Sequence, residues 1–180
     1  MKPLLFVDID GVLSCPNATN AAQPTHTLRW PAPNPHQRVR IVDGQIRIER
    51  VDEPTEDDRW ISQSVWVPDG AIDRLGLLAE VFDCVWATSW RLSGPAAWSS
   101  LLAHDPAWPS LAWEGLKLPA IVEFAGDQPW AFIDDDIAME LRDAGPLPDS
   151  PSHLLVETDS SVGITDAHVD ELLSFAAALR

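Results

Sequence analysis

The sequence predicts an α/β domain with a mostly parallel sheet covered on both faces by helices, and three observations support this. Short apolar runs alternate with helical patterns along the chain, as in strands joined by crossover helices. Two of these runs, at 3–9 and 129–136, pass from apolar residues straight into aspartates. The chain has 180 residues, of which 46% are hydrophobic, so it can bury the core of one domain. We therefore expect a single domain over residues 1–180.

The first third of the chain is expected to hold one buried strand and a small insertion. Residues 3–9 are almost continuously apolar, which is typical of a strand buried on both faces. Pro, Asn, Ala and Thr dominate residues 14–36, and this composition favours a loop. Residues 37–51 alternate polar and apolar side chains around an Asp-Gly pair, which is typical of a β-hairpin. With a further strand at 59–67, these segments predict a flap insertion at about 14–67.

The predicted hairpin carries the one cluster of basic residues in an acidic sequence. Its arginines are Arg38, Arg40, Arg47 and Arg50. Acidic neighbours such as Glu49 and Asp52 would balance these charges on a solvated face. The alternative is a flap whose arginines cover an anionic substrate, and the sequence leaves both interpretations open.

The rest of the chain alternates helices and strands. Apolar residues recur at helical spacing in 68–82, and residues suited to helix starts stand at Pro119, Asp136 and Thr165. In chain order, we expect a helix at 68–82, a strand at 84–88, helices at 94–105 and 118–126, a strand at 129–136, a helix at 137–145, a strand at 153–159 and a helix at 165–180.

The composition narrows the classes of partner. There are 28 acidic against 12 basic residues, giving a formal net charge of −16. Such a surface repels phosphate backbones and argues against a dedicated nucleic-acid binder. No apolar run reaches the roughly 18–20 residues that span a bilayer, and an aspartate interrupts the N-terminal apolar stretch, so we expect a cytosolic protein without membrane contacts. The nine tryptophans leave a homodimer open.

Acidic side chains follow two of the predicted strands. Asp8 and Asp10 stand two residues apart, so an extended chain places them on the same side. Asp134 and Asp135 end another apolar run. In parallel sheets the ligand lies beyond the carboxyl ends of the strands, so these acids are expected to converge there. A cluster of carboxylates repels itself unless a cation lies between them, and an all-oxygen set suits Mg²⁺.

The same strand ends offer the groups needed for phosphoryl transfer. A carboxylate attacks phosphorus to give an aspartyl-phosphate, and a second acid two residues on can protonate the leaving oxygen and later activate water. Thr88 or Ser89, at the end of the 84–88 strand, offers a hydroxyl and backbone N–H groups for phosphoryl oxygens. Lys117, close to a predicted helix start, offers a positive charge for the nucleophile and the phosphate.

Four short segments, taken together, resemble a known family. FVDIDGVL, VWATS, GLKLPAI and FIDDD are similar, in this order, to the four motifs of the haloacid dehalogenase-like superfamily. The resemblance covers residues 4 to about 137, and the first segment is its most specific part. The resemblance implies a Rossmann-like three-layer sandwich and Mg²⁺-dependent phosphotransfer. The insertion is too short for the large helical cap of many members.

The resemblance also implies roles for individual residues. Asp8 would be the nucleophile and Asp10 the general acid/base. Asp8, the backbone carbonyl of Asp10, and Asp134 would hold Mg²⁺, with Asp135 nearby. Superfamily dehalogenases lack an acid at the position of Asp10, so its presence favours a phosphatase. Thr88, with Ser89 beside it, would bind phosphate.

Lys117 would steady the charges of this site. The expected activity is therefore hydrolysis of a small phosphorylated substrate. Two alternatives remain open: a domain that binds a phosphorylated ligand or partner without useful turnover, and a phosphotransferase.

Overall fold

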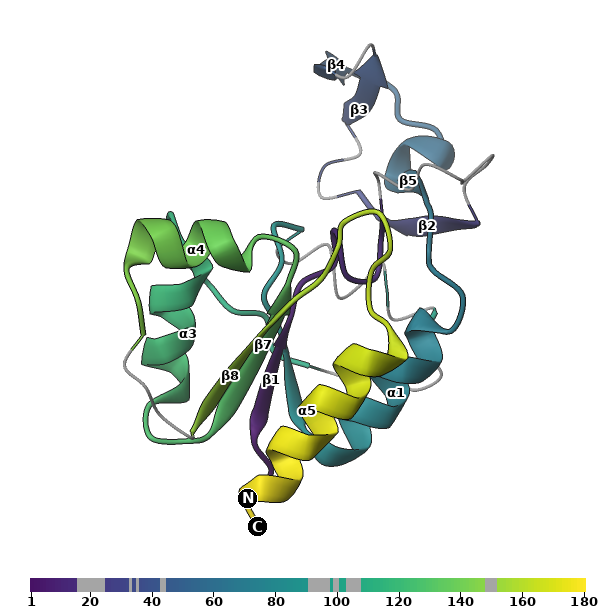
Figure 1. Cartoon of the computed structure of the whole chain (residues 1–180). Helices are drawn as coiled ribbons and strands as arrows, with labels where there is room; N and C mark the ends of the chain where they lie inside the picture. The colour runs from purple at the N-terminus through teal and green to yellow at the C-terminus, as the bar shows by residue number, and fades with distance from the viewer. Residues whose placement is uncertain are drawn as a thin grey trace.

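The computed structural model describes residues 1–15, 25–32, 34, 36–42, 45–90, 98, 101–102, 108–147 and 152–180. Four parallel strands form its central sheet, and helices flank the sheet, so the α/β class predicted from the sequence is confirmed (Figure 1). In spatial order the strands are β6 (Asp83–Trp86), β1 (Leu4–Val7), β7 (Trp130–Asp134) and β8 (His153–Glu157). Each lies where an apolar run predicted a strand.

Alternate residues of the strands pack into two separate hydrophobic clusters. Leu5, Val7 and Ile133 belong to a cluster with residues of α1 (Ala71–Val81) and α5 (Asp166–Ala178). Phe6 and Phe132 belong to a second cluster with residues of α3 (Lys117–Ala125) and α4 (Ile137–Ala144). Figure 1 shows α3 and α4 to one side of the sheet and α1 beside α5 on the other. Burial of both faces explains why the strands read as continuous apolar runs.

The insertion contains two antiparallel strand pairs. The predicted hairpin is confirmed as β3 (Gln37–Val42) and β4 (Gln45–Arg50), and its register sets Arg40 opposite Arg47. The strand predicted at 59–67 is confirmed as β5 (Trp60–Val65), which follows a short 3-10 helix, η1 (Asp57–Arg59).

The loop predicted over 14–36 is wrong in part. β2 (His26–Pro31) lies inside that range and pairs with β5. The prolines and asparagines around it masked a short strand whose Leu28 is buried. Tertiary pairing and burial of this residue outweigh the local loop composition.

Helix starts were predicted with mixed success. α5 begins directly after Thr165, whose side chain takes part in a capping box, as expected. Asp136 is the N-cap residue of α4, as expected, although its side chain makes no capping hydrogen bond. α3 begins at Lys117, two residues before Pro119. The helix expected at 94–105 lies outside the described residues apart from Trp98, Leu101 and Leu102.

None of the helices in the described ranges is both long enough and apolar enough to cross a bilayer.

Candidate functional site

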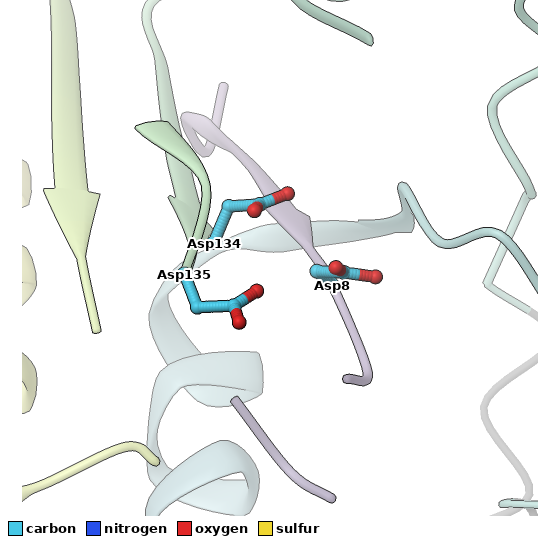
Figure 2. A group of neighbouring side chains, drawn as sticks. All are labelled: Asp8, Asp134 and Asp135. Atoms are coloured by element: carbon cyan, nitrogen blue, oxygen red, sulfur yellow. The ribbon is translucent and has the colours of Figure 1, made fainter. Parts of the chain in front are cut away.

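The parallel pairing of β1 and β7 brings two of the predicted acids together. Val7 lies opposite Ile133 in the register, so the residues that follow them, Asp8 and Asp134, lie side by side at the carboxyl edge of the sheet. Asp135 joins them, and one carboxylate oxygen from each of the three residues lies within 4.8 Å of the others. Figure 2 shows Asp134 and Asp135 leaving the end of β7 beside Asp8.

Lys117 lies between two of these acids. Its Nζ donates to Asp8 Oδ2 at 2.8 Å and to Asp134 Oδ2 at 2.7 Å. The side chains of Asp8 and Asp134 are only 7% and 1% exposed, and that of Lys117 is 14% exposed. The ammonium also lies 5.9 Å from the ring centre of Trp113. Because the three charges are shielded from water, their mutual interactions are much stronger than those of surface ion pairs.

The second oxygen of each carboxylate is held by the backbone. Ile9 N–H donates to Asp8 Oδ1 at 2.7 Å, and Asp136 N–H donates to Asp134 Oδ1 at 2.8 Å. Both acids are therefore fixed at two points, with one oxygen on an amide and the other on Lys117. A carboxylate oxygen has more than one acceptor position, so both side chains retain capacity for a further ligand.

Burial and like charges shift the protonation of these groups. Burial and, after it, neighbouring Asp8 together raise the pKa of Asp134 to about 6 against the opposing effect of Lys117. Burial and Asp134 raise the pKa of Asp135 to about 6. Burial also raises the pKa of Asp8, although Lys117 opposes the shift. Burial alone would lower the pKa of Lys117, but Asp8 and Asp134 outweigh it and raise the pKa.

Asp10 lies apart from the three acids and has its own partner. The indole Nε1–H of Trp90 donates to Asp10 Oδ2 at 2.9 Å. Burial raises the pKa of Asp10, and this hydrogen bond partly opposes the shift. The indole N–H therefore fixes the orientation of the carboxyl group while leaving its other oxygen for a proton transfer.

The turn after Asp10 requires a glycine. Gly11 has φ of 71°, in the left-handed region that glycine adopts at little cost. A Cβ at this position would overlap the side chain of Asp135. Thr158 Oγ1 also donates to the Gly11 carbonyl at 2.8 Å, which ties the turn to the end of β8. The glycine thus lets the β1 turn and the β7 acids approach closely.

The two hydroxyl candidates have different surroundings. Thr88 is 1% exposed, follows β6, and its side chain lies close enough to Asp8 to lower the pKa of that acid slightly against the larger effect of burial. The backbone N–H of Trp90 donates to Thr88 Oγ1 at 3.3 Å. Ser89 is exposed. The structure therefore brings Thr88 to the site and leaves Ser89 at its surface.

Two of the residues that shape this site were missed by sequence reasoning. The contact of Trp90 with Asp10 and the contact of Glu140 with the start of α3 both join residues far apart in the chain. Trp90 follows the hydroxyl segment, but no local pattern pairs it with Asp10. Glu140 gave no signal, because an acid within a helical pattern normally faces solvent.

A cavity adjoins the acids on the β8 side. It has a volume of about 650 Å³ and reaches from Asp135 to the end of β8 and the start of α5. Glu157 lines it at the end of β8, Asp159 in the segment between β8 and α5, and His168 in α5. The side chains of the hairpin residues Arg38, Arg40 and Arg47 lie outside the described part of the structure. Whether the hairpin arginines face an anion therefore stays a prediction.

Comparison with known proteins gives no family assignment. No protein-family model matches the chain, and no curated protein matches it either. The similarity to haloacid dehalogenase-like enzymes therefore rests on the four segments and on the residues that they bring together.

Proposed function

We propose that the protein is a Mg²⁺-dependent phosphomonoester hydrolase that works through an aspartyl-phosphate on Asp8, within a Rossmann-like three-layer sandwich. The observation that carries the proposal is the buried bridge of Lys117 between Asp8 and Asp134, with Thr88 close to the same Asp8. Residues from β1, β6, β7 and α3 meet at one sheet edge. Buried acids at this density lower stability, and such clusters with perturbed pKa values are typical of functional sites.

The donor set fits Mg²⁺. All three candidate ligands are carboxylates, and their donor oxygens lie within 4.8 Å of one another. Opposite ligands of an octahedral Mg²⁺ are about 4.2 Å apart, so small side-chain rotations suffice. Asp8, Asp134 and Asp135 would hold the ion, with the backbone carbonyl of Asp10 as a further donor. When bound, Mg²⁺ supplies positive charge that offsets the acids and the phosphoryl oxygens.

In the first half-reaction a carboxylate oxygen of Asp8 attacks phosphorus and the ester P–O bond breaks. Lys117 donates a hydrogen bond to the nucleophile and Thr88 lies close to it, and both side chains suit the phosphoryl oxygens as well. Asp10, whose pKa is raised by burial, gives its proton to the leaving oxygen. The products of this step are the free alcohol and the aspartyl-phosphate.

In the second half-reaction Asp10, now ionised, takes a proton from water as that water attacks phosphorus. The bond between phosphorus and Asp8 breaks, inorganic phosphate leaves and the Asp8 carboxylate is restored. Trp90 holds one oxygen of Asp10, so the other oxygen transfers the proton in both steps. Asp10 therefore acts first as proton donor and then as proton acceptor.

The test is turnover of a generic aryl phosphate with and without Mg²⁺. Asp8→Asn keeps the shape of the side chain and is expected to lower the rate by at least about 10³-fold. Asp127→Asn, an exposed change of the same chemistry between α3 and β7, should leave the rate unchanged. Full activity of Asp8→Asn would refute the mechanism. A panel of nucleotides, sugar phosphates and phosphopeptides that bind but stay intact would instead indicate a binding protein.

A further inference from the structure

Glu140 of α4 caps a helix to which it does not belong. α3 begins at Lys117, and its N-cap residue, Leu116, offers no side-chain hydrogen bond. Glu140 takes this role from the neighbouring helix: Lys117 N–H donates to Oε1 at 3.1 Å and Leu118 N–H donates to Oε2 at 3.0 Å. Glu140 is only 4% exposed.

The contact is stronger than an ordinary helix cap. The first amides of a helix have no partner within it, and a negative charge at this end interacts favourably with the helix dipole. Both oxygens of Glu140 are used, on successive amides, so the carboxylate fixes the backbone at two points. Hydrogen bonds to an ionised acceptor are about twice as strong as neutral ones.

The first of these two amides belongs to the lysine of the proposed active site. A lysine side chain has a flexible stem of four carbons. The position of its Cα therefore decides which acceptors its ammonium can reach. The ammonium of Lys117 must reach Asp8 and Asp134 together, at 2.8 and 2.7 Å. We propose that Glu140 is a positioning residue that places Lys117 between Asp8 and Asp134.

A purely structural role for Glu140 makes a different prediction. If it only joined α3 to α4, its loss would weaken the fold as any loss of packing does, without a particular effect on Lys117. If Glu140 positions Lys117, its substitution should expose the lysine side chain more than a substitution elsewhere that destabilises the fold equally. The positioning role concerns the folded protein alone, and only its effect on turnover rests on the proposed function.

The sequence offers a direct measurement, because the chain has two lysines, Lys117 and Lys2. Lys2 is exposed, so its rate of acetylation provides an internal reference for that of Lys117. Peptide mass spectrometry after a short pulse of an acetylating reagent gives both rates in one sample. Glu140→Gln is the test variant, since it keeps the size of the side chain but replaces one acceptor oxygen by a donor. Val169→Ala is the control, because Val169 is buried on α5.

Glu140→Gln is expected to raise the acetylation rate of Lys117 relative to Lys2 by about tenfold or more. The reason is that losing one charge-assisted hydrogen bond makes local opening around Lys117 more frequent by about this factor. Val169→Ala should change the ratio by less than about twofold while it lowers stability through lost packing. Equal ratios in the two variants at matched stability would overturn the positioning role.

Measuring turnover of the same variants distinguishes this inference from the proposed function. Glu140→Gln should lower kcat by about tenfold with little change in KM, because supporting residues of a site typically contribute 10–100-fold. A wild-type protein without turnover would refute the phosphatase proposal, and the acetylation ratio would still decide the role of Glu140. If Val169→Ala lowered kcat as much as Glu140→Gln does, the result would count against the positioning role.

Discussion

Replacing Lys117 by methionine tests the electrostatics of the site most directly. Methionine keeps most of the stem but removes the ammonium that contacts Asp8 and Asp134 at 2.8 and 2.7 Å. Breaking a buried ion pair costs about 3–5 kcal/mol, because it leaves unpaired charge behind. Protonation of one acid limits this cost. Holding an aspartate protonated at neutral pH, about three units above its ordinary pKa, costs about 4 kcal/mol.

We therefore expect Lys117→Met to lower the free energy of unfolding by about 3–4 kcal/mol at neutral pH without metal. For a chain of this size the melting temperature should fall by about 6–15 °C. Urea unfolding in EDTA measures the difference, and Lys2→Met, which removes an exposed ammonium, is the matched control. Near pH 5 the loss should be smaller, because the acids then carry the protons that replace the lysine charge.

Added Mg²⁺ should recover part of the stability of Lys117→Met at neutral pH, since a divalent cation restores positive charge among the acids. Equal unfolding of Lys117→Met and Lys2→Met in EDTA at neutral pH would refute the reasoning. It would mean that Asp8 and Asp134 tolerate each other without a cation between them.

Three further outcomes follow from the same geometry. In EDTA, the free energy of unfolding of the wild type relative to Asp134→Asn should fall as pH rises from about 4 to about 6. Burial and neighbouring Asp8 raise the pKa of Asp134 to about 6 in the folded protein, so the stability linked to its bound proton is lost through that range. Gly11→Ala should destabilise by about 1–2 kcal/mol more than Gly126→Ala in urea unfolding, since both have positive φ but only Gly11 adjoins a carboxylate that a Cβ would strike. Trp90→Phe removes a hydrogen bond that lowers the pKa of Asp10, so the alkaline limb of the kcat/KM profile should move to higher pH.

The sheet and its acids were predictable because they depend on short-range patterns. A strand buried on both faces needs a continuous apolar run, and a parallel sheet gathers the ends of its strands at one edge. Asp8 and Asp134 therefore meet for a topological reason that the chain order already contains. The hairpin was predictable for a similar reason, since its turn and its alternation are local.

The parts that sequence reasoning missed depend on contacts between distant segments. β2 is a strand because β5 pairs with it, and its flanking prolines gave the opposite local signal. Glu140 is buried because α4 lies against the start of α3, and its helical spacing alone does not distinguish a buried cap from a solvated acid. Trp90 reaches Asp10 only after β6 and β1 have paired. In each case the partner is set by the fold.

The charge balance of the site explains how an acidic protein can hold an anionic substrate. With a net charge of −16, the surface repels a phosphate at long range. At the sheet edge, Asp8, Asp134 and Asp135 gather around a single ammonium from Lys117. One positive charge offsets only part of three carboxylates, so an incoming phosphate would meet net repulsion there as well. Under the proposed function, a divalent cation held by these acids would remove that excess and would leave the ammonium available to the phosphoryl oxygens. The acids would then favour an anionic substrate by concentrating cations where the substrate reacts.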